Sequence, residues 1–280
     1  MRICTGIRDT RAACIAARTN GGRLGLVPTM GALHEGHLSL VRAARAKCDA
    51  VAVSIFVNPT QFGLSEDLSK YPRRFERDCA LLEKEGVDIL FAPAADEIYP
   101  QGQVSWVVVE GLSEKLDGRS RPGHLRGVTT IVAKLFHVVE PDAAFFGQKD
   151  AAQLAVIRRM VRDLNLTVEV VAGPIVREAD GLAMSSRNEY LSSEERVRAL
   201  VLQRSLQRVE REFLGGERRT AQLISASAEV FAAEPLVKVE YVEIVDPDTL
   251  DAVELVTGRT LVAVAAFVGS TRLIDNLVLQ

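Results

Sequence analysis

Two hydrophobic patterns alternate along the first two-thirds of the chain. Residues 51–57 (VAVSIFV) are a short β-branched and apolar run, typical of a strand covered on both faces. Residues 75–85 instead repeat apolar positions at helical spacing and end at Gly86. The same patterns predict further strands at 23–28, 87–92, 104–109, 143–146 and 168–171, and further helices from about residue 38 and at 128–139 and 151–164. This repeated order predicts an α/β fold with a doubly wound parallel, Rossmann-like sheet.

The pattern changes after about residue 173. Ser192 and Glu195 form a capping-box pair, which predicts a helix that runs to Phe213 and stops at the glycines 215–216. Helix-like positions at 220–233 are followed by three successive strand-like runs, at 237–245, 260–267 and 272–279. Helices followed by adjacent strands indicate a smaller α+β domain. We therefore expect two domains, residues 1–175 and 176–280.

Composition and charge narrow the range of partners. The 280 residues are 48% hydrophobic and 25% charged, as is ordinary for a folded globular protein. Lys and Arg number 34 against 37 Asp and Glu, which gives a net charge of −3. Proteins that bind nucleic acid through its phosphates usually show a basic excess. We therefore expect no nucleic-acid partner.

The cysteines and the apolar runs favour a cytoplasmic location. The four cysteines show neither C-x-x-C nor zinc-type spacing, and buried free thiols are the favoured interpretation for Cys14, Cys48 and Cys79, which lie in apolar, helix-like stretches. The longest apolar run, residues 261–268, is far shorter than the roughly 18 residues of a membrane span. The first ten residues carry charges and lack the apolar segment of a secretory signal. We expect no membrane partner.

The densest chemical signal is the segment 27–37 (VPTMGALHEGH), directly after the first predicted strand. Ligands of doubly wound sheets bind beyond the carboxyl ends of the strands, so this loop is suitably placed. Gly31 and Gly36 leave room for a ligand to approach the backbone. His34 and His37 are three residues apart and share one face at a helix N-terminus, where amides and the helix dipole attract phosphate. Imidazole donors there would stabilise charge that develops at phosphorus.

A metal site and the common glycine-rich phosphate loops account for this segment less well. Metal binding by the two histidines is disfavoured, because H-E-x-x-H would need a histidine at Leu38, and only His124 and His137 remain as further ligands. The chain contains neither GxxxxGK[ST] nor a properly spaced GxGxxG.

A second signal lies far downstream, at residues 184–187 (MSSR). Hydroxyls and a guanidinium there suit a departing pyrophosphate.

These two signals together resemble the HxGH and KMSKS-like elements of class I aminoacyl-tRNA synthetases and nucleotidylyltransferases. Within that superfamily, ordered blocks across the chain are similar to motifs of the pantothenate synthetase family. The blocks are PTMGALHEGH at 28–37, VNPTQF at 57–62, RPGH at 121–124, FGQKD at 146–150, DGLAMSSRN at 180–188 and RLIDN at 272–276. The resemblance covers essentially the whole chain.

The resemblance implies where the ligands bind. Position by position, it places the ATP site on Met30, Gly31, Ala32, Leu33, His34, Glu35, Gly36, His37, Gly147, Gln148, Lys149, Asp150, Val176, Met184, Ser185, Ser186 and Arg187. His37 matches the family's proton donor, which we describe physically as a donor that stabilises phosphate. Gln61 matches the residue shared by pantoate and β-alanine, and Gln153 a second pantoate contact. From the residues alone, Gln61 would read as part of a turn and Gln153 as the polar face of a helix.

The residue pattern around Lys149 also favours a role in phosphate binding, independently of the resemblance. It follows the strand at 143–146 in a glycine turn, where a lysine can reach phosphate as a point charge. Asp150 is equally suited to cap the next helix. The chain departs modestly from the family at Gln148, Arg74 and Leu125, and the last leaves the role of the His124 loop open. We expect His37, His34 and Lys149 to be the catalytic residues.

The implied reaction activates the carboxylate of pantoate with Mg²⁺-ATP and then couples it to the amine of β-alanine. The resemblance implies no tightly bound cofactor and no metal site of the protein's own, Mg²⁺ entering with ATP, and it implies a homodimer. The first domain would bind ATP and pantoate, and the second would close over it. The alternatives are another enzyme of the superfamily, a nucleotidylyltransferase or a truncated aminoacyl-tRNA synthetase, and a non-catalytic ATP-sensing or scaffold protein.

Overall fold

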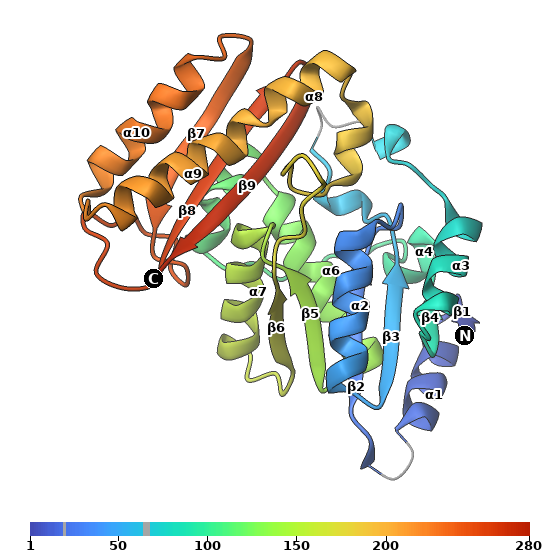
Figure 1. Ribbon diagram of the computed structural model, residues 1–280. Coiled ribbons are helices and arrows are strands. Elements are labelled where there is room, and N and C mark those ends of the chain that lie inside the picture. Colours follow the sequence, from blue (N-terminus) through green and yellow to red (C-terminus); the bar gives the residue numbers. More distant parts are fainter. Residues whose placement is uncertain (19–20, 64–67) are drawn as a thin grey trace. The chain divides into compact units, whose positions relative to one another are not determined.

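The computed structural model describes residues 1–18, 21–63 and 68–280 (Figure 1). These residues form two compact units. Unit 1 comprises Met1–Gly147 and Val156–Gly173, and unit 2 comprises Gln148–Ala155 and Pro174–Gln280. Among the described residues, no helix has both the length and the apolar character to cross a membrane.

Unit 1 is built on a parallel sheet. Its strands are β1 (Arg2–Cys4), β2 (Leu24–Thr29), β3 (Ala50–Ile55), β4 (Ile89–Phe91), β5 (Ala143–Gly147) and β6 (Glu169–Gly173). They pair in the order β1-β4-β3-β2-β5-β6, and every pairing is parallel. From the β2–β5 pair the order runs outward through β3 and β4 on one side, with β1 at the edge, and to β6 on the other, so the sheet is doubly wound and the prediction is confirmed. Such a sheet binds ligands where the order reverses, beyond the carboxyl ends of those two strands.

Helices cover both faces of this sheet. The helices of this part of the chain are α1 (Ile7–Ala17), α2 (Glu35–Lys47), α3 (Phe75–Lys84), α4 (Ala95–Ile98), α5 (Asp117–Ser120), α6 (His124–Val139) and α7 (Ala151–Asp163), with short 3₁₀ turns η2 (Pro59–Gln61), η3 (Leu68–Lys70) and η4 (Leu112–Glu114). In Figure 1, α2 lies in front of the sheet and α6 behind it. Val27 and Val53 of the sheet pack with Leu40 and Val41 of α2 in one buried cluster. This packing fixes where α2 begins relative to β2.

The predicted strand at 104–109 is not present. In this segment Val104, Trp106 and Val108 are exposed although they are apolar, and Ser105 between them is exposed as well. Its backbone, however, bonds to threonine hydroxyls of α6 rather than to a strand. The Val107 amide donates to Thr130 Oγ1 over 3.1 Å, and its carbonyl accepts from Thr129 Oγ1 over 2.7 Å. The apolar, β-branched residues indicated an extended segment, but a helix and not a neighbouring strand bonds to its backbone.

Unit 2 is the smaller α+β part. Its sheet is antiparallel in the order β7-β8-β9, formed by β7 (Val237–Val245), β8 (Thr260–Val268) and β9 (Thr271–Leu279). Its helices are α8 (Ser193–Ala199), α9 (Val201–Leu214) and α10 (Thr220–Ala232), preceded by the 3₁₀ turn η5 (Ser186–Tyr190). Apolar residues of α9 and α10 pack on the strands in one buried cluster. The predicted second α+β domain is therefore confirmed as a fold class.

The helix predicted from Ser192 to Phe213 is interrupted. The Ser192–Glu195 capping box is present, with the Glu195 amide donating to Ser192 Oγ over 3.2 Å. The first helix ends at Ala199, and Leu200 separates it from α9. Ala199 and Val201 are both completely buried. Residues two apart cannot share a face of one regular helix, and the interruption lets both reach the core.

Candidate active site

The turn between β2 and α2 is held from beneath by one buried carboxylate. Gly31 has a φ of 84° and Ala32 a φ of 50°, so two successive residues adopt the left-handed region. The Asp78 side chain accepts hydrogen bonds from the Ala32 amide over 2.8 Å and from the Leu33 amide over 2.9 Å. A Cβ on Gly31 would lie 3.1 Å from Asp78 Oδ2. Glycine is therefore required here on both conformational and steric grounds.

His34 and His37 form a reciprocal cap at the start of α2. His34 Nδ1 accepts from the Gly36 amide over 3.2 Å, and His37 Nδ1 accepts from the His34 amide over 3.3 Å. The two ring centroids are 4.1 Å apart. A neutral imidazole whose Nδ1 accepts carries its proton on Nε2. The backbone thus fixes both histidines as Nε2–H donors at a helix N-terminus, where anions are favoured.

Glu35 lies between these histidines but points elsewhere. Its side chain is exposed and pairs with Arg42 on the surface of α2. Glu35 supplies the one carboxylate among the predicted ATP-site residues 30–37, and this carboxylate is engaged in the ion pair with Arg42. The side chain therefore offers nothing that would bind a phosphate, although its backbone belongs to the loop.

Gln61 is buried in η2 beside Met30. Its Nε2 lies 2.9 Å from Met30 Sδ, and its Oε1 accepts from Asn58 Nδ2 over 3.0 Å. Asn58 Nδ2 also donates to the Gly127 carbonyl over 3.1 Å. The structure thus brings together a residue of the predicted ATP loop and the residue predicted for both small substrates. The bond from Asn58 fixes the orientation of the Gln61 amide.

Further polar residues lie around Gln61, and the sequence assigned none of them a role. Asn58 Oδ1 accepts from the Tyr99 hydroxyl over 2.8 Å, and burial raises the pKa of that phenol because it disfavours phenolate. His124 Nδ1 lies 2.7 Å from the Gln61 carbonyl, and Arg121 Nη1 lies 2.8 Å from His124 Nε2. A carbonyl can only accept and a guanidinium can only donate, so His124 is a neutral Nδ1–H tautomer. This assigns the His124 loop a role in supporting Gln61.

The segment after β5 carries Gly147, Gln148, Lys149 and Asp150. Gly147 ends the strand in unit 1, and the next three residues begin unit 2. The Lys149 side chain is 17% exposed, and its Nζ lies 3.9 Å from Asp150 Oδ1. Asp150 directly precedes α7, and its carbonyl accepts from the Leu154 amide over 2.9 Å, as at a helix start. Gln153 is half-buried in the first turn of α7.

The segment 176–187 of unit 2 is a tight hairpin followed by η5. The Met184 amide donates to the Val176 carbonyl over 2.9 Å, so two predicted ATP-site residues are paired. The turn predicted at 180–181 is present, with the Gly181 amide donating to the Glu178 carbonyl over 2.8 Å. Ser185 Oγ accepts from the Arg187 amide over 3.3 Å and caps η5.

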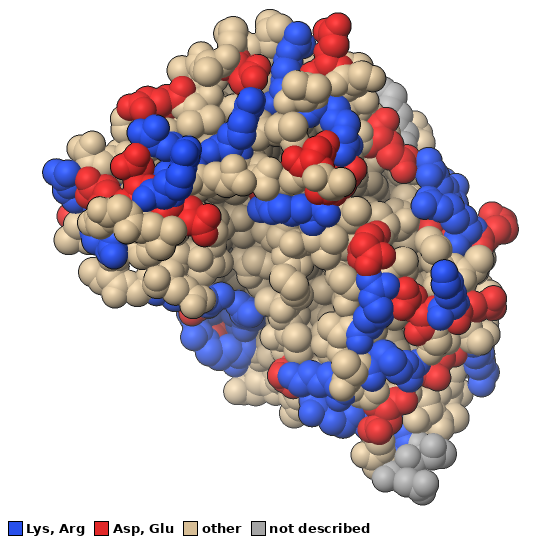
Figure 2. Space-filling view, in the orientation of Figure 1, with Lys and Arg blue, Asp and Glu red and all other residues tan. Residues whose placement is uncertain are grey.

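The donors of these segments suit anionic ligands. The described residues contain no group of three or more His, Cys, Asp or Glu side chains placed to hold a metal ion. On the face shown in Figure 2, lysines and arginines are interspersed with acidic side chains over the residues drawn in colour. The cations at 149 and 187 and the Nε2–H groups of His34 and His37 offer local, directed donors for anions.

Comparison with known proteins gives consistent matches along the whole chain. The model of the pantoate-beta-alanine ligase family matches residues 2–278. The pantothenate synthetase of Acidobacterium capsulatum is 65% identical over 256 residues, covering 91% of this chain and 86% of that protein. That of Koribacter versatilis is 57% identical over 280 residues, covering 100% of this chain and 96% of that protein.

Two solved structures extend the similarity to the fold. The crystal structure of pantothenate synthetase from Thermus thermophilus has a TM-score of 0.94 and 47% identity, covering 99% of each chain. A Francisella tularensis pantoate-beta-alanine ligase, complexed with beta-gamma ATP and beta-alanine, has a TM-score of 0.75 and 30% identity. That match covers 99% of this chain and 97% of the Francisella chain.

Proposed function

This chain belongs to the pantoate-beta-alanine ligase family, and from that premise we propose that it condenses (R)-pantoate with β-alanine through a pantoyl-adenylate. Family membership makes it a ligase enzyme of pantothenate biosynthesis. The route through an adenylate, with release of AMP and pyrophosphate, is the part that we propose. The observation that carries it is the reciprocal cap of His34 and His37, which makes both side chains Nε2–H donors at the start of α2, in the turn that follows β2.

The first step transfers adenylate to pantoate. A carboxylate oxygen of pantoate attacks the α-phosphorus of ATP, and the bond from that phosphorus to the bridging oxygen breaks. Pyrophosphate leaves with the electron pair. His34 and His37 donate to phosphate oxygens as charge shifts, and Lys149 and Arg187 balance the charge of the leaving group.

The second step forms the amide. The uncharged amine of β-alanine attacks the carbonyl carbon of the adenylate. The bond from that carbon to the AMP oxygen breaks, AMP leaves with the pair, and the nitrogen loses a proton. Gln61 suits this step, because its buried amide can donate to a carboxylate or accept from a hydroxyl without a competing charge.

We assign the ligands to the residues that the sequence predicted. ATP would contact the loop from Met30 to His37, the segment from Gly147 to Asp150, Val176, and the loop from Met184 to Arg187. Pantoate and β-alanine would contact Gln61 and Gln153. The similar Francisella enzyme, solved with beta-gamma ATP and beta-alanine, supports this class of ligands.

Magnesium fits this scheme as a companion of ATP. Mg²⁺ usually keeps several waters and binds through phosphates and one or two carboxylates, so it needs no cage of protein ligands. Asp150 offers one carboxylate beside Lys149. When bound, the ion would neutralise phosphate charge.

We also propose a cytoplasmic homodimer. The unpaired cysteines support the reducing compartment, and sedimentation at micromolar concentration tests the dimer.

One assay separates this proposal from its nearest alternative, a nucleotidylyltransferase. AMP and pyrophosphate should form only with ATP, Mg²⁺ and pantoate together, and AMP release should accelerate when β-alanine is added. A nucleotidylyltransferase would retain the AMP moiety in its final product. Equal AMP release with unrelated amino acids in place of both substrates would contradict the proposed reaction.

A further inference from the structure

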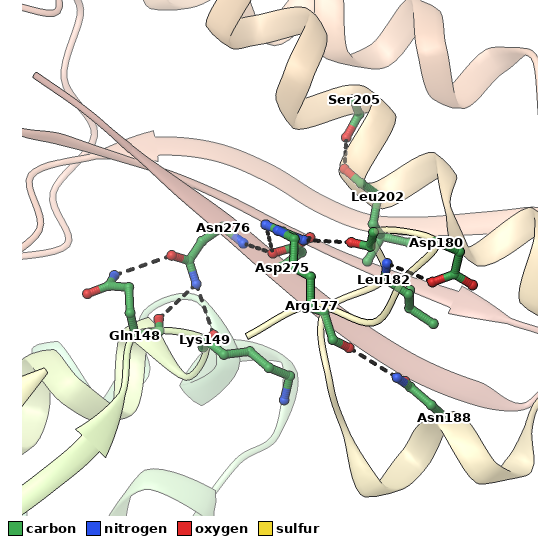
Figure 3. A network of polar contacts seen from close by, with 12 residues as sticks. Gln148, Lys149, Arg177, Asp180, Leu182, Asn188, Leu202, Ser205, Asp275 and Asn276 are labelled. Carbon is green, nitrogen blue, oxygen red and sulfur yellow. Dashed lines mark hydrogen bonds and ion pairs between the residues drawn. The ribbon is translucent and has the colours of Figure 1, made fainter. Parts of the chain in front are cut away.

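Two neighbouring residues of β9 reach two different segments of unit 2. Asp275 and Asn276 are each 3% exposed, although both are polar. Successive side chains of a strand leave it on opposite sides. Figure 3 shows the result, with Asn276 directed to the segment of Gln148 and Lys149, and Asp275 directed to Arg177.

Asn276 holds the backbone of the lysine segment. Its Nδ2 donates to the Gln148 carbonyl and to the Lys149 carbonyl, each over 2.9 Å. Its Oδ1 accepts from Gln148 Nε2 over 3.3 Å. Both protons of the amide and its oxygen are therefore used on this one segment. An aspartate here would place a carboxylate against two carbonyl oxygens, so only the amide fits.

Asp275 holds the hairpin that leads into the loop 184–187. It accepts a forked pair of bonds from Arg177, over 2.7 Å and 3.0 Å. Arg177 Nη1 also donates to the Gly181 carbonyl at the tip of the hairpin over 3.1 Å, and Arg177 pairs with Ala183 across it. The backbone of Asn276 donates to Asp275 Oδ1 over 2.8 Å, which joins the two halves of the network.

We infer that Asp275 and Asn276 are positioning residues for adenylation. They tie the Lys149 segment, and the hairpin that leads into the loop Met184–Arg187, to one strand, so that the two groups proposed to grip pyrophosphate are set at a fixed spacing. The inference rests on the proposed function, because it takes its meaning from those two segments binding ATP. Neither residue needs to touch a substrate.

The test compares the two half-reactions in one variant. Asn276→Ala removes both donors from the Gln148 and Lys149 carbonyls. A shift of about 1 Å in a positioned group can cost about 100-fold, so pyrophosphate release from ATP and pantoate should fall by about 10- to 100-fold. Pantothenate formation from supplied pantoyl-adenylate needs no leaving pyrophosphate and should fall by less than about threefold.

Thr260→Val is the matched control. Thr260 is 4% exposed in the same sheet, and its hydroxyl donates to the Gly258 carbonyl over 2.9 Å. Like Asn276→Ala, this change removes buried polar bonding, but it leaves the two ATP segments alone. Both half-reactions of the control should stay within about twofold of the unsubstituted enzyme.

A double-variant cycle distinguishes positioning of Lys149 from general support of the fold. In the Lys149→Ala background the lysine is already gone, so adding Asn276→Ala should cost less than about threefold in pyrophosphate release. General support would multiply the loss by the same factor in both backgrounds, and that result would overturn the inference.

The proposed function and the positioning role of Asn276 give different results when each is wrong. If the unsubstituted enzyme makes no pyrophosphate from ATP and pantoate, the proposed function is wrong. If it does, but Asn276→Ala matches Thr260→Val or slows both half-reactions equally, the positioning role is wrong. Should Asn276→Ala not fold, Arg177→Lys, which keeps the charge but loses the fork, is judged by the same criteria.

Discussion

Replacing Asp78 by alanine should destabilise the protein and weaken ATP use together. Asp78 lies in α3 with 1% of its surface exposed, and its carboxylate accepts the amides of Ala32 and Leu33. Both amides belong to buried residues of the turn that leads to His34. The variant removes the acceptor from both amides at once.

The magnitude follows from those two bonds. A hydrogen bond to a charged group contributes about 1.5–3 kcal/mol, and a buried donor left unpaired costs about 1–3 kcal/mol. Both figures estimate the same loss of two hydrogen bonds, so they are not added together. Water that enters the space left by the side chain would recover part of the loss. We therefore expect the free energy of unfolding to fall by about 3 kcal/mol. Because the turn also fixes the start of α2, the KM for ATP should rise about tenfold.

Urea unfolding at 25 °C and pyrophosphate release measure the two effects. Glu76→Ala is the control, since Glu76 is an exposed acid in the same first turn of α3. It removes only an interaction with the helix dipole, which contributes about 0.3–1 kcal/mol. An Asp78→Ala variant that unfolds like Glu76→Ala and keeps its KM for ATP would refute the reasoning.

The other predictions concern the proposed catalytic groups and the thiols. Lys149→Ala should slow pyrophosphate release by about 100-fold, and coupling from supplied pantoyl-adenylate much less; equal losses in rapid-quench assays would remove the lysine from pyrophosphate departure. His34→Ala and His37→Ala should each lower turnover by about 100-fold, with about 1 kcal/mol of stability lost with the cap. A variant that melts much earlier but keeps its turnover per folded molecule would make that histidine structural. Burial disfavours the thiolate and raises the pKa of Cys14 to about 11, so at pH 8 iodoacetamide should label half-buried Cys79 first. Mass spectrometry that finds Cys14 labelled first would contradict the burial.

Short patterns in the sequence were sufficient to predict those elements whose signal lies in a few consecutive residues. The β-branched run of β3 and the capping box at Ser192 are visible in a few consecutive residues, and both are present. The prediction of a strand at 104–109 was wrong because apolar, β-branched residues do not show whether a strand or a helix will bond to the backbone of the segment. The interruption at Leu200 follows from burying Ala199 and Val201 together, which only the packed helices impose.

The residues that support the candidate site are far along the sequence from the residues that they contact. Asp78 is 46 residues from Ala32, and Asn276 is 127 residues from Lys149. In the sequence, an acid in the first turn of a helix indicates an interaction with the helix dipole, and nothing nearby names its distant partner. The resemblance marked the blocks that contain Gln61 and Asn276. The contacts that give these residues a task appear only in the folded chain.

The central claim is that the carboxylate of pantoate attacks the α-phosphorus of ATP. Pantoate labelled with ¹⁸O in its carboxylate tests this directly, with the products of turnover analysed by mass spectrometry. An acyl-adenylate hands one labelled oxygen to AMP when the amine displaces it, so AMP should carry one ¹⁸O, the amide of the product one, and pyrophosphate none. Unlabelled AMP, or label in inorganic phosphate released alongside ADP, would contradict the account.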